Sequence, residues 1–253
     1  VLFRSMTGYA VQQEIPGLKE VHAVDAAGVH PLLLAIGSER YTPYLQNKRP
    51  AEILTIANHI LGTGQLSLAK FLFITATNNR NIATHHVPEF LRYLFERIDF
   101  TRDLHFYTQT TIDTLDYSGE DLNSGSKLVL AAYGDPIRTL CTEIPSALHQ
   151  LKSFKDPRVC LPGVIALSSP AFSDYTQAQK EMQLLNDQLI NQDLTGVAQL
   201  IICDDSNFVA KNLSNYLWVT YTKCNPSHDI QIGRAHRLNS SHLVISYAVF
   251  CLK

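Results

Sequence analysis

A short apolar run, Phe71-Leu72-Phe73-Ile74, constrains the fold more than any other stretch of this sequence. It follows a Gly62-Thr63-Gly64 turn and Lys70, and it precedes a polar loop from 75 to 83. An apolar run without polar alternation is typical of a strand that is covered on both faces, as in a parallel or mixed sheet. The stretch from 62 to 116 therefore predicts a strand–crossover–helix unit around which the rest of the chain packs.

The other elements are predicted from hydrophobic periodicity and turn residues. Together they indicate the α/β class, with a mixed sheet and flanking helices. Pro50 is expected as the first residue of a helix, and Thr84 and Asp174 as N-caps. The proline-rich stretch from 133 to 173 is expected mostly to wrap the surface. Strands are expected at 20–25, 31–36, 71–74, 128–132, 163–167 and 199–203, and helices at 50–61, after Thr84, at 174–190 and after Asn207.

The last part of the chain, about 197–231, resembles the unit around Phe71. Gln199–Cys203 is a second buried-strand run, and a polar turn and a helix follow it. In the segments 97–103 and 223–229 that follow the two helices, a basic residue precedes an aspartate by six positions. These parallels predict two copies of one strand–turn–helix unit in the same sheet.

Length and composition narrow the classes of protein to consider. The 253 residues suffice for one large domain or two small ones. A formal net charge of −2 argues against a nucleic acid or an anionic membrane bound through bulk charge. No apolar run reaches the roughly 18 residues of a membrane-spanning helix, so a soluble, cytoplasmic protein is expected. The five cysteines form no Cys-x-x-Cys pair, which favours free thiols over disulfides or a zinc site.

Both ends of the chain resemble translated sequencing-adapter DNA. The resemblance covers residues 1–5 and 232–253, and we exclude these segments from functional reasoning. The domain is therefore expected to span residues 6–231. The natural gene is expected to extend beyond the chain in both directions.

Several candidate sites are weak on spacing or context. The Gly62-Thr63-Gly64 turn lies after a helix and before a strand, the reverse of a phosphate-binding glycine loop. Five residues, rather than four, separate Gly119 from Gly125 before Ser126-Lys127, which does not fit a P-loop. Asp204-Asp205 is more typical of carboxylates that are solvated or that cap the following helix than of a metal site. A metal pair of His22 and His30 lacks a nearby carboxylate or cysteine at ligand spacing, so strand histidines are favoured.

Three stretches, KFLFIT, ERIDFTRDLHF and TTIDTLDYSGEDLNSGSKLVLAA, resemble the C-terminal domain of the UbiD family of decarboxylases over roughly residues 15–132. The sequence departs from the family at 76–79, which replaces an acidic turn, and at Phe100, which replaces a proline. These departures indicate a divergent branch. The similar positions are Gly64-Gln65, Lys70, Arg97, Thr101-Arg102-Asp103, Ile112-Asp113, Leu115-Asp116 and Gly125-Ser126-Lys127.

The resemblance implies non-oxidative decarboxylation of an aromatic or α,β-unsaturated carboxylic acid on prenylated FMN held with a divalent metal, typically Mn²⁺. It also implies a homo-oligomer and makes ubiquinone or menaquinone biosynthesis an expected role. The family's catalytic and metal-binding residues lie in a preceding flavin domain, and its Glu-Gly-Pro-Phe-Gly-Glu signature is absent from this sequence. No catalytic, cofactor-binding or metal-binding residue is therefore assigned, and the chain alone is expected to be inactive.

One candidate site follows from the resemblance. In the family, the segment matching Thr110, Thr111 and Ile112 folds back toward the flavin domain and helps to wall the substrate pocket. The alternative for Ile112 is a simple core position. At the level of function, the alternative to a decarboxylase fragment is a non-catalytic oligomerisation or assembly module, and an independent nucleotide-binding domain is a third, weaker interpretation.

Overall fold

The computed structural model describes residues 10–28, 30–44, 46, 48–77, 82–119, 121–235 and 244–251. We call residues up to 132 the first half and the remainder the second half. The first half contains β1 (Glu20–Ala23), η1 (Asp25–Ala27), β2 (Leu32–Gly37), α2 (Glu52–Leu61), η2 (Gly64–Leu68), β3 (Phe71–Ala76), α3 (Val87–Phe95), β4 (Leu104–Thr111) and β5 (Ser124–Ala132). The second half contains α4 (Ser146–His149), β6 (Lys155–Leu161), β7 (Val164–Ser168), α5 (Tyr175–Leu189), β8 (Gln199–Cys203), α6 (Ser206–Ala210), α7 (Leu213–Lys223), α8 (Pro226–Asp229), β9 (Ile230–Ala235) and β10 (Val244–Cys251).

The strands form two mixed sheets rather than one. The strand orders are β1-β2-β3-β5-β4 in the first half and β6-β7-β8-β10-β9 in the second. In each sheet the three central strands are parallel and both edge strands are antiparallel to their neighbours. The α/β class with mixed sheets and flanking helices is confirmed. The expectation that β3 and β8 share one sheet is wrong, because each lies at the centre of its own sheet.

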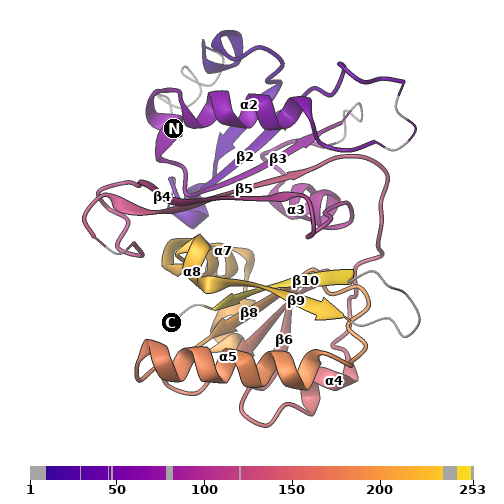
Figure 1. The fold of residues 1–253 in the computed structure, drawn as a ribbon, viewed down its shortest axis with the longest axis vertical. Helices are drawn as coiled ribbons and strands as arrows, with labels where there is room; N and C mark the ends of the chain where they lie inside the picture. Colours follow the sequence, from indigo (N-terminus) through magenta and orange to yellow (C-terminus); the bar gives the residue numbers. More distant parts are fainter. Residues whose placement is uncertain are drawn as a thin grey trace.

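Helices and sheets alternate in layers (Figure 1). Helix α2 covers the outer face of the first sheet, and α5 covers the outer face of the second. Helices α3 and α7 lie between the two sheets, so that one helix from each half contributes to the layer that joins them. The largest hydrophobic core therefore belongs to both halves at once.

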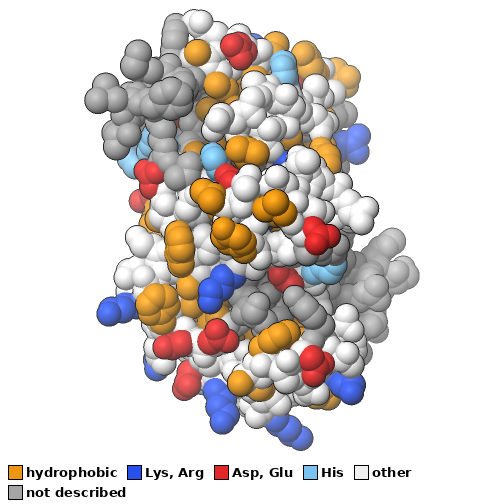
Figure 2. Space-filling view, turned by 90° about the vertical axis from the view of Figure 1, so that its left-hand side faces the viewer, with side chains coloured by type: hydrophobic (Ala, Val, Ile, Leu, Met, Phe, Trp, Pro, Cys, Tyr) orange, Lys and Arg blue, Asp and Glu red, His pale blue; other side chains and the backbone are white. Residues whose placement is uncertain are grey.

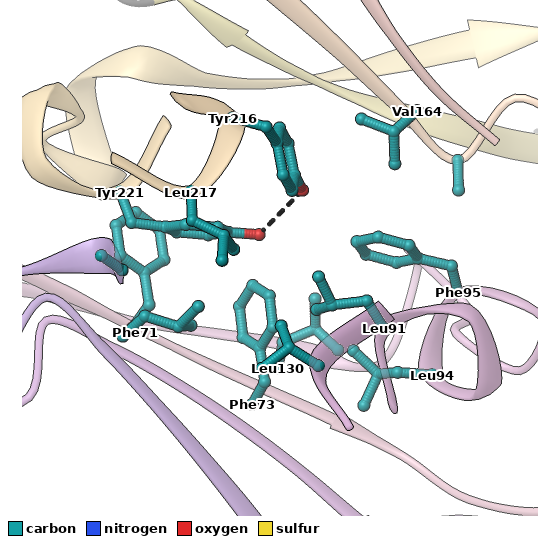
Figure 3. Close-up of a cluster of buried hydrophobic side chains, with 14 of the residues drawn as sticks. Phe71, Phe73, Leu91, Leu94, Phe95, Leu130, Val164, Tyr216, Leu217 and Tyr221 are labelled. Atoms are coloured by element: carbon teal, nitrogen blue, oxygen red, sulfur yellow. Dashed lines mark hydrogen bonds between the residues drawn. The ribbon is translucent and has the colours of Figure 1, made fainter. Parts of the chain in front are cut away.

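Strand β3 shows how the sequence produces these layers. Successive side chains of a strand point to opposite faces, so Phe71 and Phe73 point one way and Leu72 and Ile74 the other. The phenylalanines enter the central core, where the ring of Tyr221 from α7 lies 5.1 Å from Phe71 and 5.6 Å from Phe73 (Figure 3). Leu72 and Ile74 pack in the outer cluster that contains α2. A continuous apolar run is required because both faces are buried.

Two of the predicted helix starts differ from the structure. Thr84 is not the N-cap of α3, which begins after His86. The Thr84 hydroxyl donates instead to Glu20 Oε1 at 2.7 Å, because the residue is buried against β1. Pro50 precedes α2 by two residues instead of opening it. Asp174 caps α5 as predicted, accepting from the Gln177 backbone amide at 2.9 Å.

The stretch from 133 to 173 contributes more to the fold than a surface wrap. It contains α4, β6 and β7, and Leu148 and Phe154 are buried in the core beneath α5. Pro157 lies in β6, which is the edge strand of the second sheet. A proline is tolerated there because the outer side of an edge strand needs no backbone donor.

The remaining expectations concern the ends and the cysteines. Residues 1–5 lie outside the described residues, whereas part of the tail, Val244–Cys251, forms β10 between β8 and β9. The adapter origin of both segments stays a prediction. Among the residues that the structure describes, no helix is long and apolar enough to cross a membrane. Cys141, Cys160 and Cys203 are free thiols, as predicted.

Candidate functional site

The predicted pocket residues Thr110, Thr111 and Ile112 lie where β4 passes into a loop. Thr110 and Thr111 end the strand, opposite Gly125 and Ser124 of β5. Thr111 is exposed and Thr110 is partly buried, whereas Ile112 is only 3% exposed. We call residues 112–123, which connect the two strands, the β4–β5 loop.

Ile112 is held in a slot that two glycines form. A Cβ atom added at Gly119 or at Gly125 would lie 2.8 Å from Ile112 Cδ1. The Ile112 backbone amide also donates to the Asn123 carbonyl at 3.3 Å, which closes the loop at its base. Within this chain Ile112 is thus a core side chain beneath its own loop, and the exposed surface of the predicted segment is that of Thr111.

A hydrogen bond and an ion pair fasten the β4–β5 loop across the amino-terminal ends of neighbouring parallel strands. Asp113 pairs with Nδ1 of His30, which lies just before β2. Asp116 Oδ2 lies 2.8 Å from Nζ of Lys70, which immediately precedes β3. The side chains of Lys70 and Asp116 are only 2% and 5% exposed, so the second pair is buried. The loop is therefore anchored at β2, β3 and β5.

The electrostatics of the two pairs differ because their burial differs. Burial opposes ionisation of Asp113, but hydrogen bonds from the Leu115 amide and His30 outweigh it, and the pKa of Asp113 is lowered. For Lys70 burial dominates: it lowers the pKa of the ammonium despite the opposing charge of Asp116. A buried ammonium needs its counter-ion and its hydrogen-bond acceptors, so Lys70 fixes the loop as long as Asp116 is present.

The outer side of the same loop is apolar and exposed. The exposed fractions of Leu115, Tyr117 and Leu122 are 78%, 86% and 75%. The loop projects at the side of the first sheet in Figure 1, and Figure 2 views that side. Hydrophobic side chains gather across the middle of this face. The loop thus has a polar inner side that anchors it and an apolar outer side that meets solvent.

The other residues that resemble the family motif also make structural contacts. Arg97 donates from Nε to the Gly134 carbonyl at 3.0 Å, and its guanidinium lies 3.6 Å from the centre of the Tyr93 ring. Arg102 forms a 2.6 Å ion pair with the fully buried Asp103. Lys127 donates to the Ser67 carbonyl. These contacts explain the motif largely as a set of supports for the first sheet.

The described residues contain no group of three or more His, Cys, Asp or Glu side chains that could hold a metal ion. They do not fit an Mn²⁺ site, and we assign neither the metal nor a flavin to residues of this chain. Asp205 caps α6, accepting from the amides of Asn207 at 2.9 Å and Phe208 at 3.1 Å, as its sequence context favoured. His22 bonds the Thr84 carbonyl at 3.0 Å, which is a structural contact.

Sequence reasoning does not find all the partners of the loop. The sequence presents His30 only as a strand histidine, although its partner Asp113 lies 83 residues further along the chain. Asn225 of the second half stands out only as part of the repeat, yet its Oδ1 accepts from Ser126 Oγ at the start of β5. No local sequence signal connects residues so far apart, since these pairs depend on how the sheets and helices meet.

Comparison with known proteins places the chain in a family. The sequence profile of the family described as 3-octaprenyl-4-hydroxybenzoate carboxy-lyase C-terminal domain matches residues 2–132, just over half of the chain. An uncharacterized protein of Chlamydia trachomatis serovar D is 32% identical over 222 residues, covering 86% of this chain and 34% of its own length. A subunit of the 4-hydroxybenzoate decarboxylase of Chlamydia pneumoniae is 29% identical over 224 residues, covering 88% and 34%.

Solved structures of UbiD-class enzymes are also similar to the chain. HmfF from Pelotomaculum thermopropionicum, solved with FMN, has 16% identity and a TM-score of 0.39, covering 57% of this chain and 30% of its own. Vanillic acid decarboxylase from Sedimentibacter hydroxybenzoicus, in its open form, has 13% identity and a TM-score of 0.42, covering 71% and 31%. The chain spans about a third of the length of the curated relatives that it matches. On the profile match, the chain belongs to the family of the UbiD carboxy-lyase C-terminal domain.

Proposed function

We propose that the protein containing this chain is a UbiD-type decarboxylase. The reaction is non-oxidative: an aromatic or α,β-unsaturated carboxylic acid loses its carboxyl group as CO₂, and a proton takes its place on the carbon. Prenylated FMN and Mn²⁺, bound outside this chain, belong to the proposal, as do cytoplasmic location, homo-oligomerisation and a role in quinone biosynthesis. The family match over residues 2–132 is the observation that carries it.

The contribution of this chain is to wall the substrate pocket, not to supply reacting groups. The β4–β5 loop is anchored by Asp113 and Asp116, so its outer surface is presented in a fixed position. Thr111 is exposed at the start of that surface, and Leu115 and Tyr117 follow it. An apolar surface of this kind suits an aromatic or unsaturated acid, whose hydrocarbon part is best bound by apolar contacts.

The alternative is a non-catalytic assembly module. Its support is the exposed apolar side of the same loop, formed by Leu115, Tyr117 and Leu122, because such surfaces are often protein-binding sites. The upstream gene sequence separates the two functions. A metal-ligand Asn/His/Glu set followed by Glu-Gly-Pro-Phe-Gly-Glu supports the decarboxylase, whereas an unrelated upstream domain supports the module.

The experimental test uses the full-length protein reconstituted with prenylated FMN and a panel of aromatic and α,β-unsaturated acids. Wild-type protein is expected to release CO₂ from members of the panel. Ile112→Trp overfills the slot formed by Gly119 and Gly125 and should displace the loop, and Thr111→Trp adds bulk at the exposed position without this packing cost. Both variants are expected to change the ranking of substrates while retaining flavin.

A matched control places the same side chain far from the loop. Leu184 lies on α5, beyond the second sheet, and is 53% exposed, so Leu184→Trp should leave the substrate ranking unchanged. Flavin-loaded protein that decarboxylates no acid of the panel would contradict the proposed activity. An unchanged ranking in both loop variants would contradict the pocket wall alone.

A further inference from the structure

The second half of the chain contacts the supports of the β4–β5 loop directly. Lys70 Nζ donates to Ser118 Oγ at 2.7 Å and pairs with Asp116 at 2.8 Å, both within the loop. Its remaining acceptor is the Thr222 carbonyl of α7, at 3.1 Å. The charge of Asp229, in α8, also acts on the Lys70 ammonium. The residue that fastens the loop to β3 is therefore shared with the second half.

A second contact joins the second half to the part of β5 that packs against Ile112. Ser126 Oγ, at the start of β5, donates to Asn225 Oδ1 and accepts from the Ser227 backbone amide at 2.9 Å. Ser126 and Asn225 are only 1% and 7% exposed. Ser126 directly follows Gly125, whose missing Cβ leaves the space that Ile112 fills. A shift of this part of β5 would therefore change the slot in which the loop is seated.

The first half contains a turn with corresponding backbone hydrogen bonds, to the carbonyls of Asp99 and Asn225, but its first side chain makes different contacts. The Asp99 amide donates to Asp103 Oδ2 at 2.8 Å, and the Asn225 amide donates to Asp229 Oδ2 at 2.6 Å. The side chain of Asp99, however, accepts from Thr101 Oγ1 at 2.6 Å within its own turn. The side chain of Asn225 bonds within its turn through Nδ2, to His228 Nδ1 at 3.0 Å, and its Oδ1 crosses to Ser126 of the other half. The crossing contact is thus not needed to form such a turn.

We propose that the turn from Asn225 to Asp229 positions the β4–β5 loop of the first half, with Asn225 as a positioning residue that acts through Ser126. The second half is then a support for the loop rather than an independent appendage. The consequence for substrate binding rests on the proposed function, whereas the positioning of the loop can be measured separately.

The test is hydrogen–deuterium exchange of the full-length protein, which reports local opening of the loop. The loop amides of Leu115 and Ser118 are bonded to Asp113 and Asp116 at 2.8 and 2.9 Å. In Asn225→Ala, peptides covering residues 112–118 are expected to exchange about fivefold to tenfold faster, because the support beneath them is lost. Asn225→Asp loses the Nδ2 contact with His228 but keeps an oxygen acceptor for Ser126, so its exchange should be slower than that of Asn225→Ala.

A control variant separates loop positioning from general loss of stability. Asp174→Ala removes the N-cap of α5, on the far side of the second sheet, and should leave exchange in 112–118 unchanged. Unchanged exchange in Asn225→Ala would overturn the proposal, and so would an increase that Asp174→Ala reproduces in the same peptides. If exchange rises only in Asn225→Ala while the tryptophan variants leave the substrate ranking unchanged, the positioning role stands and the pocket assignment fails.

Discussion

The two sheets of this chain share one plan but differ in chemistry. Their strand orders and directions correspond, with β3 and β8 in the same place. The registers correspond as well: Phe71 stands opposite Leu32 in the first sheet, and Gln199 stands opposite Val164 in the second. The residues just before these positions are Lys70 and Ala198, so an alanine occupies the position in the second sheet where the first has a buried charge.

The helices between the sheets differ in the same way. When the two halves are aligned on Asp99 and Asn225, Phe95 of α3 corresponds to Tyr221 of α7. Phe90 then corresponds to Tyr216. All four rings are buried. The tyrosine hydroxyls of α7 lie 3.1 Å apart, and Tyr216 donates to Gln199 at 2.8 Å. The two halves thus share a backbone arrangement. The first has a buried ion pair at the amino-terminal end of β3, and the second has a neutral polar network.

Separating the two halves of the chain should have the largest effect on folding. Residues 1–132 expressed alone are expected not to fold cooperatively, because the inner face of the first sheet would lose the cover that α7 provides and expose Phe71 and Phe73. Near-ultraviolet circular dichroism and thermal unfolding, measured beside the whole chain, would check this. A cooperative transition in the isolated half would show that the two halves are independent domains.

Breaking the Lys70–Asp116 pair should have the next largest effect. Asp116→Ala leaves a buried ammonium without its ion-pair partner and is expected to reduce the free energy of unfolding by about 3 kcal/mol. Lys70→Met/Asp116→Ala removes both charges and makes the position before β3 apolar, like Ala198 before β8. It should reduce the free energy of unfolding less than Asp116→Ala alone. Urea unfolding measures both differences. A double variant that is less stable than Asp116→Ala would contradict the equivalence of the two sheets.

The parts of the fold that could be predicted from sequence are those with local signals. Phe71–Ile74 and Gln199–Cys203 are buried on both faces, and a continuous apolar run is typical of such strands. Strand β4 was missed because much of Leu104–Thr111 is exposed, and β6 because its edge position tolerates Pro157. Placing the repeats in one sheet was wrong because repetition in sequence says nothing about which strands pair.

The sequence predicts the loop of the candidate site but not the residues that anchor it. The sequence singled out the segment from Thr110 to Asp116, since its resemblance to a family lies in consecutive residues. Its anchors, His30 and Lys70, and the more distant Asn225 come from other parts of the chain. Strand pairing in the first sheet brings His30 and Lys70 to the loop, and the packing of α7 and α8 between the sheets brings Asn225. No pattern within a single element predicts these contacts.

The polar network of α7 gives a smaller effect. Tyr216→Phe removes the donor to Gln199 and should reduce the free energy of unfolding by roughly 1 to 2 kcal/mol, since Gln199 is only 1% exposed and its amide nitrogen already lacks a partner within the described residues. Tyr216→Phe/Tyr221→Phe/Gln199→Met makes all three positions apolar, as Phe90, Phe95 and Phe71 are in the first half, and should be nearly neutral. Chemical denaturation would check both, and a triple variant much less stable than Tyr216→Phe would show that the network is needed.

The smallest effect concerns the pH dependence of the turn at Asp229. Burial raises the pKa of Asp229 above its ordinary value of 3.8, although the Asn225 amide, His228 and Lys70 oppose the shift. The folded state therefore holds this proton to higher pH than the unfolded chain does. The stability contributed by the protonated group is complete below pH 3.8 and is lost as pH rises through the raised pKa.

Asp229→Asn removes this titration, so its stability relative to wild type should improve as pH rises above 3.8, with a limiting slope of about 1.4 kcal/mol per pH unit. Urea unfolding of both proteins at several pH values up to 7 measures the difference. Burial also raises the pKa of Asp103, but there the Arg102 guanidinium, at 2.6 Å, stays charged over this whole range. Asp103→Asn should therefore lose a strong ion pair near neutral pH. Parallel pH profiles for wild type and Asp229→Asn would instead mean that Lys70 and His228 hold Asp229 ionised, as Arg102 does for Asp103 in the first half.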